Sequence, residues 1–281
     1  MTNQDPGILF SIIIVNYNSG SLLKDCLTSI IDNLDEGYEI IIYDNASSDD
    51  SLRMVNTAFP ADSRIRILEG NENLGFAKAN NRAAGFAAGK YLHFLNPDIV
   101  VNPKLRADYD LIAGDQGESV YVTSLIDEDG KPMKDRHIIP TLGNYFNCIF
   151  HKGKVAYWNI GASLIISRDS FHLICGWSED YFLYAEDMDL FYTLYRNHIP
   201  VRYLDTKLLH IGKGTTRQFW TKSQRALTVE LSFKKFYRKH GFLMEYYVTR
   251  PILLLYVLFH EPAEFFLQVK TFIRASLIRT R

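Results

Sequence analysis

Hydrophobic and polar positions divide the first 212 residues into short strands that alternate with helices. Short runs rich in β-branched and aromatic residues predict strands at residues 8–15, 38–43, 64–68 and 91–95. Stretches of helical character separate these runs, near residues 21–34, 49–58 and 76–88. This alternation predicts a mostly parallel sheet with crossover helices. The continuously apolar segment 12–15 is typical of a strand that is covered on both faces.

The pattern changes after residue 102. We expect a helix near residues 104–113, strands near 119–126 and 157–167, a helix near 187–198 and strands near 200–212. The polar stretch 127–144 is expected to form a loop or hairpin over a ligand site. The predicted fold class is therefore α/β, with a sheet flanked by helices over residues 1–215. A basic, amphipathic helical extension is expected over residues 216–281.

Charge is distributed unevenly along the chain. Residues 213–281 carry 13 Lys or Arg and 4 Glu, whereas residues 1–212 carry 18 basic and 28 acidic residues. Apolar residues recur at helical spacing within the basic part: Ala226, Val229, Phe233, Phe236 and Tyr237, and then Phe265, Val269, Phe272 and Ser276. A basic segment can bind nucleic acid, an acidic partner or an anionic membrane, and this apolar content favours the membrane.

A membrane contact of this kind would be peripheral. The longest uninterrupted apolar run of the basic part, residues 252–259, is eight residues long, far below the roughly 20 that span a bilayer. The alternative stays open, in which the helices pack on the rest of the chain and keep a solvated basic face. No nucleic-acid partner is expected. The sequence does not indicate whether the chain is a monomer or an oligomer.

The remaining composition is that of an ordinary globular protein. Apolar residues make up 47% of the chain and charged residues 22%. Cys26, Cys148 and Cys175 are widely spaced, which suggests neither a disulfide framework nor a cysteine zinc site. Residues 1–7 lack a basic n-region, so we expect no signal peptide. We expect a cytoplasmic protein that can also lie on the inner face of the cell membrane.

Polar residues follow the predicted strands, where an open parallel sheet binds its ligands. The first strand ends in Asn16-Tyr17-Asn18, and the chain lacks both G-x-G-x-x-G and the P-loop motif. Asp44 ends the second strand and can accept a hydrogen bond from the imide N–H of uracil or thymine. Asp98 follows the fourth strand and Pro97, and its carboxylate can begin a Mg²⁺ or Mn²⁺ site.

Three carboxylates lie within four residues, at Glu186, Asp187 and Asp189. Carboxylates this close repel one another and are costly to desolvate, so a helix N-terminus, a cation or a catalytic task must account for them. A helix N-terminus carries partial positive charge, which compensates Glu186 and Asp189 as first-turn residues. Asp187 then remains to be explained by chemistry.

Taken in order, these motifs resemble the family 2 inverting glycosyltransferases of the GT-A fold, particularly the bacterial rhamnosyltransferase-like members. The resemblance covers roughly residues 8–215. It is carried by SIIIVNYN at residues 11–18, DNASSD at 44–49, NENLGFAKAN at 71–80, LNPD at 95–98, NIGASLIISR at 159–168, GWSEDYFLYAEDMDL at 176–190 and HIG at 210–212.

The resemblance implies a role for each matching residue. Asp187 would be the catalytic base, and Asp98 would bind the metal with help from His210. Asn96 stands on the donor side, where many relatives have the first aspartate of a D-x-D-like motif. Asp44 would read the base. The other donor-binding residues would be Asn16, Tyr17, Asn18, Asn73, Gly75 and Asn80, and those bordering the acceptor would be Gly161, Trp177 and Glu186.

The implied reaction transfers a sugar from a dTDP- or UDP-linked donor, for example dTDP-rhamnose, to a glycan or lipid-linked saccharide with inversion. A divalent metal, Mg²⁺ or Mn²⁺, is the implied cofactor. The processive Q-x-x-R-W pattern is absent; the nearest string is RQFW at residues 217–220, which favours single addition. Two alternatives stay open. A nucleotidyltransferase should carry a Gly-rich, Lys-bearing segment after its first strand, and a non-catalytic sugar-nucleotide- or glycan-binding protein would differ only in an assay.

Overall fold

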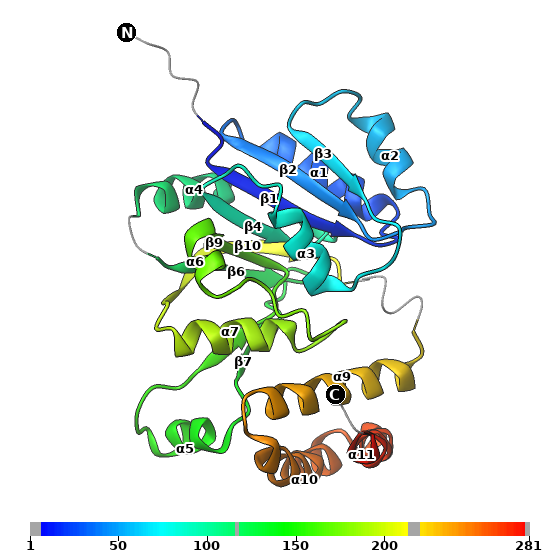
Figure 1. Ribbon diagram of the computed structural model, residues 1–281, viewed down its shortest axis with the longest axis vertical. Helices are drawn as coiled ribbons and strands as arrows, with labels where there is room; N and C mark the ends of the chain where they lie inside the picture. Colours follow the sequence, from blue (N-terminus) through cyan, green and yellow to red (C-terminus); the bar gives the residue numbers. More distant parts are fainter. Residues whose placement is uncertain (1–6, 116–117, 213–219, 279–281) are drawn as a thin grey trace.

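The computed structural model describes residues 7–115, 118–212 and 220–278. In it, an eight-stranded sheet is flanked by helices, and a further group of helices lies at the lower end of the molecule in Figure 1. The boundary predicted between residues 215 and 216 lies outside the described residues. No helix in the described part of the chain combines the length and the apolar character that crossing a membrane requires.

The sheet joins a parallel half to a mixed half. Its strands are β1 (Phe10–Asn16), β2 (Tyr38–Asp44), β3 (Ile65–Glu69), β4 (Tyr91–Leu95), β5 (Ile99–Val100), β6 (Val120–Ile126), β9 (Ser163–Ser167) and β10 (Val201–His210). They lie in the order β3-β2-β1-β4-β9-β6-β10-β5. The first four strands are parallel, as predicted, while β9 runs antiparallel to both of its neighbours.

The central strand β1 is covered on both faces, as its unbroken apolar run predicts. Successive side chains of a strand point to opposite faces, so Ile13 packs in one core and Ile12 and Ile14 in the other. The core around Ile12 and Ile14 includes side chains from α1 (Ser21–Asn33), α2 (Ser51–Ala58) and α4 (Lys104–Gly114). The core around Ile13 includes side chains from α3 (Phe76–Ala84), α6 (Arg168–Leu173) and α7 (Glu186–Arg196).

The segment from residue 127 to 167 departs most from the prediction. The strand expected over residues 157–167 is two strands, because the chain leaves the ribbon formed by β8 (Tyr157–Asn159) and β7 (Arg136–Ile138) and enters the main sheet as β9. The polar stretch that was expected to cover the site contributes β7 and leads into an unpredicted helix, α5 (Leu142–Phe150). Thr141 caps α5 by accepting a hydrogen bond from the Asn144 N–H.

The C-terminal helices form a third core with the α/β part. They are α9 (Lys222–Lys239), α10 (Leu243–His260) and α11 (Pro262–Leu277), and α10 was not predicted. Phe236, Tyr237 and Tyr246 pack against Tyr181 and Met188. One face of the C-terminal helices therefore packs on the rest of the chain, as one of the two alternatives predicted.

Candidate active site

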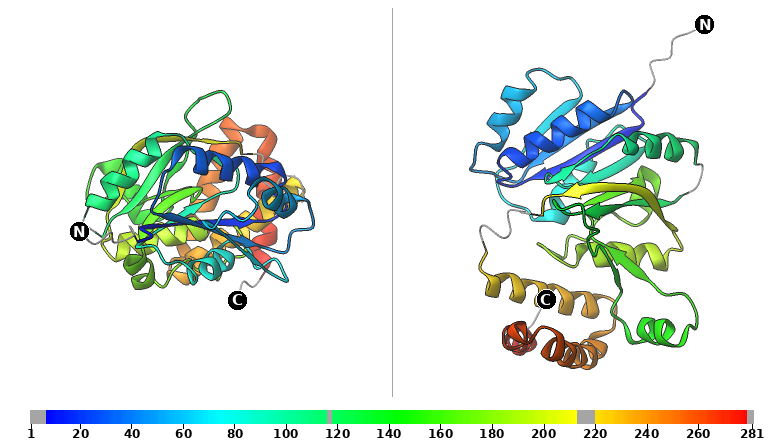
Figure 2. Two further views of the ribbon diagram at one scale, coloured as in Figure 1. Left: turned by 90° about the horizontal axis from the view of Figure 1, so that it is seen from above. Right: turned by 180° about the vertical axis from the view of Figure 1, so that it is seen from behind.

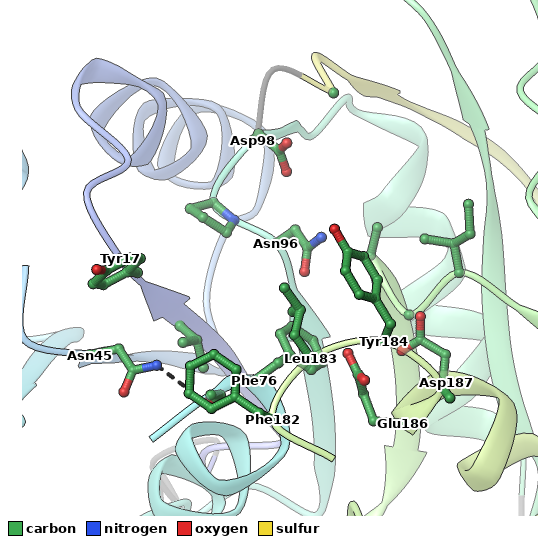
Figure 3. Close-up of a pocket in the computed structure, with 18 of the residues that line it drawn as sticks. Tyr17, Asn45, Phe76, Asn96, Asp98, Phe182, Leu183, Tyr184, Glu186 and Asp187 are labelled. Carbon is green, nitrogen blue, oxygen red and sulfur yellow. Dashed lines mark hydrogen bonds between the residues drawn. The ribbon is translucent and has the colours of Figure 1, made fainter. Parts of the chain in front are cut away.

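A cavity of about 840 Å³ opens at the carboxyl edge of the sheet (Figure 3). Its lining includes the predicted residues Tyr17, Asn73, Gly75, Asn96, Asp98, Gly161, Glu186, Asp187 and His210. The predicted residues Asn16, Asn18, Asp44, Asn80 and Trp177 do not line it. Segments that are far apart in the sequence thus meet at one place, as expected for strand ends and the loops that follow them.

Asp187 lies in the first turn of α7, and its local geometry is unusual. The two residues that precede the helix, Tyr184 and Ala185, have φ of 69° and 66°, a left-handed conformation that side-chain-bearing residues rarely adopt. Such strain persists only where the surrounding structure imposes it, and it is common at active sites. Asp187 is half-buried, and burial raises its pKa to about 6 although a hydrogen bond from the Gly161 backbone opposes the shift. Its carboxylate is therefore mostly ionised near neutral pH and can still accept a proton.

Gly161 lies so close to Asp187 that it cannot carry a side chain without displacing neighbouring atoms. A Cβ at this position would lie 2.6 Å from the Asp187 Oδ1 and 3.0 Å from the Trp177 ring. Gly161 therefore permits the approach that lets its backbone hold the carboxylate. The family resemblance implies that Gly161 borders the acceptor. The structure adds that Gly161 contacts Asp187.

Glu186 is buried beside Asp187, and its Oε2 has no hydrogen-bond partner among the described residues. Burial and the negative charge of Asp187 raise the pKa of Glu186 well above its ordinary value. Both causes disfavour the ionised form of Glu186, so they oppose a second negative charge beside Asp187.

Asp189 belongs to a different network, on the side of α7 that faces α9. It accepts hydrogen bonds from Lys239 Nζ at 2.8 Å, His240 Nε2 at 2.5 Å and the Tyr181 hydroxyl at 3.2 Å. Burial alone would raise the pKa of Asp189, but the bonds from His240 and Lys239 lower it overall. The three neighbouring acids thus have three environments, and Asp189 connects the first turn of α7 to the C-terminal helices.

Asp98 and His210 are brought together by the pairing of β5 with β10, in which His210 lies opposite Ile99. The His210 Nε2 is 3.3 Å from the Asp98 Oδ2, and both residues line the cavity. The buried His210 Nδ1 has no partner in the described part of the chain. No group of three or more metal-ligating side chains occurs among the described residues. One carboxylate and one imidazole suit a cation that completes its coordination with phosphate oxygens and water.

Asp44 and Asn16 form a buried network behind the cavity wall. The Asn16 side chain donates to Asp44 Oδ1 at 2.7 Å, and the Ser47 N–H donates to Asp44 Oδ2 at 2.9 Å. The Asn18 side chain accepts from the Ser48 N–H at 2.7 Å. These bonds fix the loop after β2, and the base-reading role of Asp44 stays a prediction.

Asn45, which is not among the predicted site residues, lines the cavity beside this network. Its side chain donates to Asn73 Oδ1 at 2.9 Å and accepts from the Leu74 N–H at 2.7 Å. It thereby holds the loop that carries the predicted donor residues Asn73 and Gly75. The sequence feature that could have identified Asn45 is its position directly after the predicted second strand.

The loop before α7 is fastened to α3. Asn81 accepts from the Trp177 N–H at 3.0 Å and donates to its carbonyl at 2.8 Å. The Phe76 N–H donates to the Phe182 carbonyl at 3.1 Å. A Cβ on Gly75, whose φ is 80°, would lie 2.2 Å from that carbonyl oxygen, so glycine is required for the close approach.

Two predicted residues support the wall from within. Trp177 is only 1% exposed and packs edge-on against Phe76 and Phe94, so its ring has no free face for an acceptor sugar. Asn80 is buried and donates to the Phe76 carbonyl one helical turn earlier. Two other tryptophans line the cavity instead: Trp158 on β8, and Trp220, which stacks on Phe182 at 6.4 Å. Of the RQFW string, only Trp220 is described.

Helix α9 forms one side of the cavity through Val229 and Phe233. It is held to the loop before α7 by a hydrogen bond from Ser232 Oγ to the Leu183 carbonyl at 3.0 Å and by one from Lys235 Nζ to the Asp180 carbonyl at 2.6 Å. The C-terminal extension is therefore part of the site.

Comparison with known proteins supplies the context for this arrangement. The model of a family described as "Glycosyl transferase family 2" matches residues 11–174. The glycosyltransferase GlyG of Streptococcus pneumoniae is 25% identical over 160 residues, which cover 57% of this chain and 46% of GlyG. The rhamnosyltransferase WbbL of Escherichia coli is 25% identical over 240 residues, which cover 76% of this chain and 88% of WbbL.

The putative teichuronic acid biosynthesis glycosyltransferase TuaG of Bacillus subtilis is 35% identical over 98 residues, which cover 35% of this chain and 38% of TuaG. The chain thus spans less than half the length of GlyG and of TuaG. Among solved structures, S. aureus TarS 1–349 in complex with UDP-GlcNAc matches with a TM-score of 0.61 at 18% identity, covering 95% of this chain and 79% of that one. This likeness confirms the predicted α/β architecture.

Proposed function

The chain belongs to glycosyl transferase family 2, and from this premise we propose that it transfers a sugar from a nucleotide-diphosphate donor to a saccharide hydroxyl with inversion. The observation that carries the proposal is that a carboxylate with a pKa of about 6, Asp187, and a carboxylate–imidazole pair, Asp98 and His210, line one cavity (Figure 3). An inverting displacement needs both a base at the acceptor and stabilisation of the departing diphosphate.

Asp187 acts on the acceptor in this proposal. Its ionised carboxylate takes the proton of the attacking hydroxyl as the oxygen forms a bond to the anomeric carbon and the bond to the diphosphate breaks. The Gly161 backbone holds the carboxylate in place, and the raised pKa of the buried Glu186 disfavours a second negative charge near the attacking oxygen. One ionised carboxylate therefore suffices at the acceptor end.

Asp98 and His210 act on the donor. A divalent cation, Mg²⁺ or Mn²⁺, would neutralise charge that develops on the leaving diphosphate, and these two residues would hold it. The neighbouring Asn96 lines the cavity without adding charge. Its amide can donate to a donor oxygen, where a carboxylate would instead ligate the metal.

The nucleoside is proposed to lie at the end of the cavity formed by Tyr17, Asn45, Phe76 and Phe182. Figure 3 places these side chains together, away from Asp187. Aromatic rings can stack on a base, and amide groups can bond to its edge. The TarS complexes with UDP and UDP-GlcNAc support a uridine or thymidine diphosphate donor, and the name of WbbL supports testing rhamnose. A glycan or lipid-linked saccharide in the cytoplasm is the proposed acceptor.

The proposal is tested with a panel of UDP- and dTDP-sugars and the wild-type chain, with and without Mn²⁺. Thermal shift measures donor binding, and release of nucleoside diphosphate in the presence of saccharide acceptors measures transfer. We expect one donor to stabilise the protein, more strongly with Mn²⁺, and Asp98→Ala to remove the metal-dependent part of the shift. A metal-independent shift that Asp98→Ala leaves unchanged would contradict the assignment of the cation to Asp98, and the absence of a shift with every nucleotide sugar would contradict the donor assignment. Pyrophosphate release from a nucleoside triphosphate would favour the nucleotidyltransferase, and binding without turnover would favour the binding protein.

A further inference from the structure

Three helices at one end of the molecule present large apolar side chains to solvent. Figures 1 and 2 place α5, α10 and α11 at this end from opposite viewing directions. Phe259 is 79% exposed and Phe266 is 80% exposed. We name this surface the apolar end and define it by its exposed residues: Leu142, Phe146, Ile149 and Phe150 of α5; Met244, Tyr247, Val248, Ile252, Leu255, Tyr256, Leu258 and Phe259 of α10; and Phe266, Ile273 and Leu277 of α11.

The spacing of these residues gives each helix one continuous apolar stripe. Met244, Val248, Leu255 and Phe259 follow one another at steps of four, seven and four residues along α10, so they share one face. The opposite face of α10 is already used, because Tyr246 and Val257 are buried. The exposed stripe is therefore surplus to the core of this chain. Soluble monomers rarely expose contiguous apolar patches of this kind unless something binds there.

The apolar end is held together by contacts between segments that lie far apart in the sequence. The Leu142 N–H at the start of α5 donates to Glu245 Oε2 of α10 at 2.7 Å. The Tyr237 hydroxyl of α9 donates to the Pro140 carbonyl just before α5. Lys234 is buried and donates to the carbonyls of Ala275 and Ile278 at 2.7 and 2.8 Å, which fixes the end of α11. The surface is thus a built part of the fold.

Exposed charges beside the apolar end are mostly basic. Lys152 and Lys154 follow α5, and Lys270 and Arg274 lie on α11 next to the stripe of Phe266, Ile273 and Leu277. None of these four basic residues has an ion pair among the described residues. Both acids of α10 and α11 are engaged: Glu245 bonds to Leu142, and Glu264 pairs with Lys222. Between residues 243 and 277, this leaves Glu261, at the junction of the two helices, to offset the four cations.

We propose that the apolar end docks on the surface of an anionic lipid bilayer. The apolar stripes lie in the boundary between headgroups and acyl chains, and the lysines and Arg274 lie among the phosphates. A second copy of the chain fits less well, because a two-fold axis would bring the same cations together with little acidic surface to neutralise them. The proposal does not depend on the transfer reaction and requires no helix to cross the membrane.

The test is sedimentation of the full chain with vesicles of phosphatidylcholine alone and with vesicles that also contain phosphatidylglycerol. Leu255 is 58% exposed at the apolar end and Leu173 is 60% exposed on α6, which makes them a matched pair. We expect Leu255→Glu to weaken partition into anionic vesicles by about tenfold or more, since it removes a leucine that docking would bury and adds a charge to the docked face. Leu173→Glu should bind like the wild type.

The charge contribution is tested in the same assay. Lys270→Glu should reduce partition roughly fivefold or more, whereas Lys104→Glu, an exposed change on α4, should not. Raising the salt concentration should weaken wild-type binding in the same direction. Unchanged circular dichroism and thermal unfolding of each variant establish that the fold is retained.

Three results would overturn the proposal. One is that the wild-type chain fails to sediment with anionic vesicles; another is that Leu255→Glu and Leu173→Glu bind equally. The third is a dimer in light scattering without lipid that Leu255→Glu dissociates, which would assign the surface to a second copy of the chain.

Discussion

The two sides of the cavity are built in different ways. On the side of the parallel strands, polar residues at strand ends are held by neighbours within the same sheet edge, as where Asn16 bonds to Asp44. On the side of α7, the partners come from outside that sheet edge: Asp187 accepts a hydrogen bond from Gly161 in the loop before β9, and Asp189 accepts bonds from Lys239 and His240 at the end of α9. The strand side is therefore fixed by the pairing of adjacent parallel strands. On the helix side, which bears the proposed chemistry, the placement of the carboxylates depends on packing between separate elements.

The largest expected effect comes from removing the base. Asp187→Asn keeps the size and the possible hydrogen bond from Gly161 but cannot accept a proton. We expect transfer to fall by about 10²–10⁴-fold, the usual contribution of general-base catalysis, while donor affinity stays near that of the wild type. Initial rates and donor titrations measure the two quantities separately. Near-normal turnover by this variant would remove Asp187 from the reaction.

A smaller effect is expected when the contact that positions Asp187 is disturbed. Gly161→Ala adds a Cβ that would lie 2.6 Å from the Asp187 Oδ1, so the carboxylate must shift. A displacement of about 1 Å can reduce a rate about 10²-fold, and we expect a loss of that order in kcat. Gly143→Ala on α5 is the matched control, because nothing lies within 4 Å of its added Cβ. Equal activity of the two variants would show that the Gly161 contact does not position Asp187.

The connection between α7 and α9 should affect stability more than chemistry. Asp189→Asn removes the charge that Lys239 and His240 surround, and we expect a loss of about 1–3 kcal/mol in the free energy of unfolding. Because the folded-state pKa of Asp189 is lowered, its stabilising contribution is present above the unfolded pKa and is lost as pH falls through the folded value. Thermal unfolding across an acidic pH series should therefore show a smaller pH-dependent loss for the variant. Identical curves for both proteins would argue against the ion pair.

The same contrast explains what could be predicted from the sequence. Strands β1 to β4 are contiguous apolar runs with polar ends, so local pattern was enough to place them and to bring Asp98 to the ligand edge. Their register was not predicted; it joins residues far apart in the sequence, such as Phe10 of β1 and Tyr38 of β2.

Long-range packing explains what was missed. Trp177 resembles a sugar-binding aromatic in sequence, but Phe76 and Phe94 enclose it. The break between β8 and β9 arises because the chain changes sheets, which no local periodicity reveals. Asp189 looked like a simple helix-start acid, because its partners Lys239 and His240 come from another helix.

The pH dependence of transfer tests the central claim most directly. If Asp187 is the base, kcat at saturating donor should fall about tenfold for each unit of pH below its pKa of about 6, because protonation removes the acceptor lone pair. Circular dichroism at each pH confirms that the protein stays folded over this range. A rate that stays constant well below pH of about 6 in folded protein would contradict the assignment of Asp187 as the catalytic base.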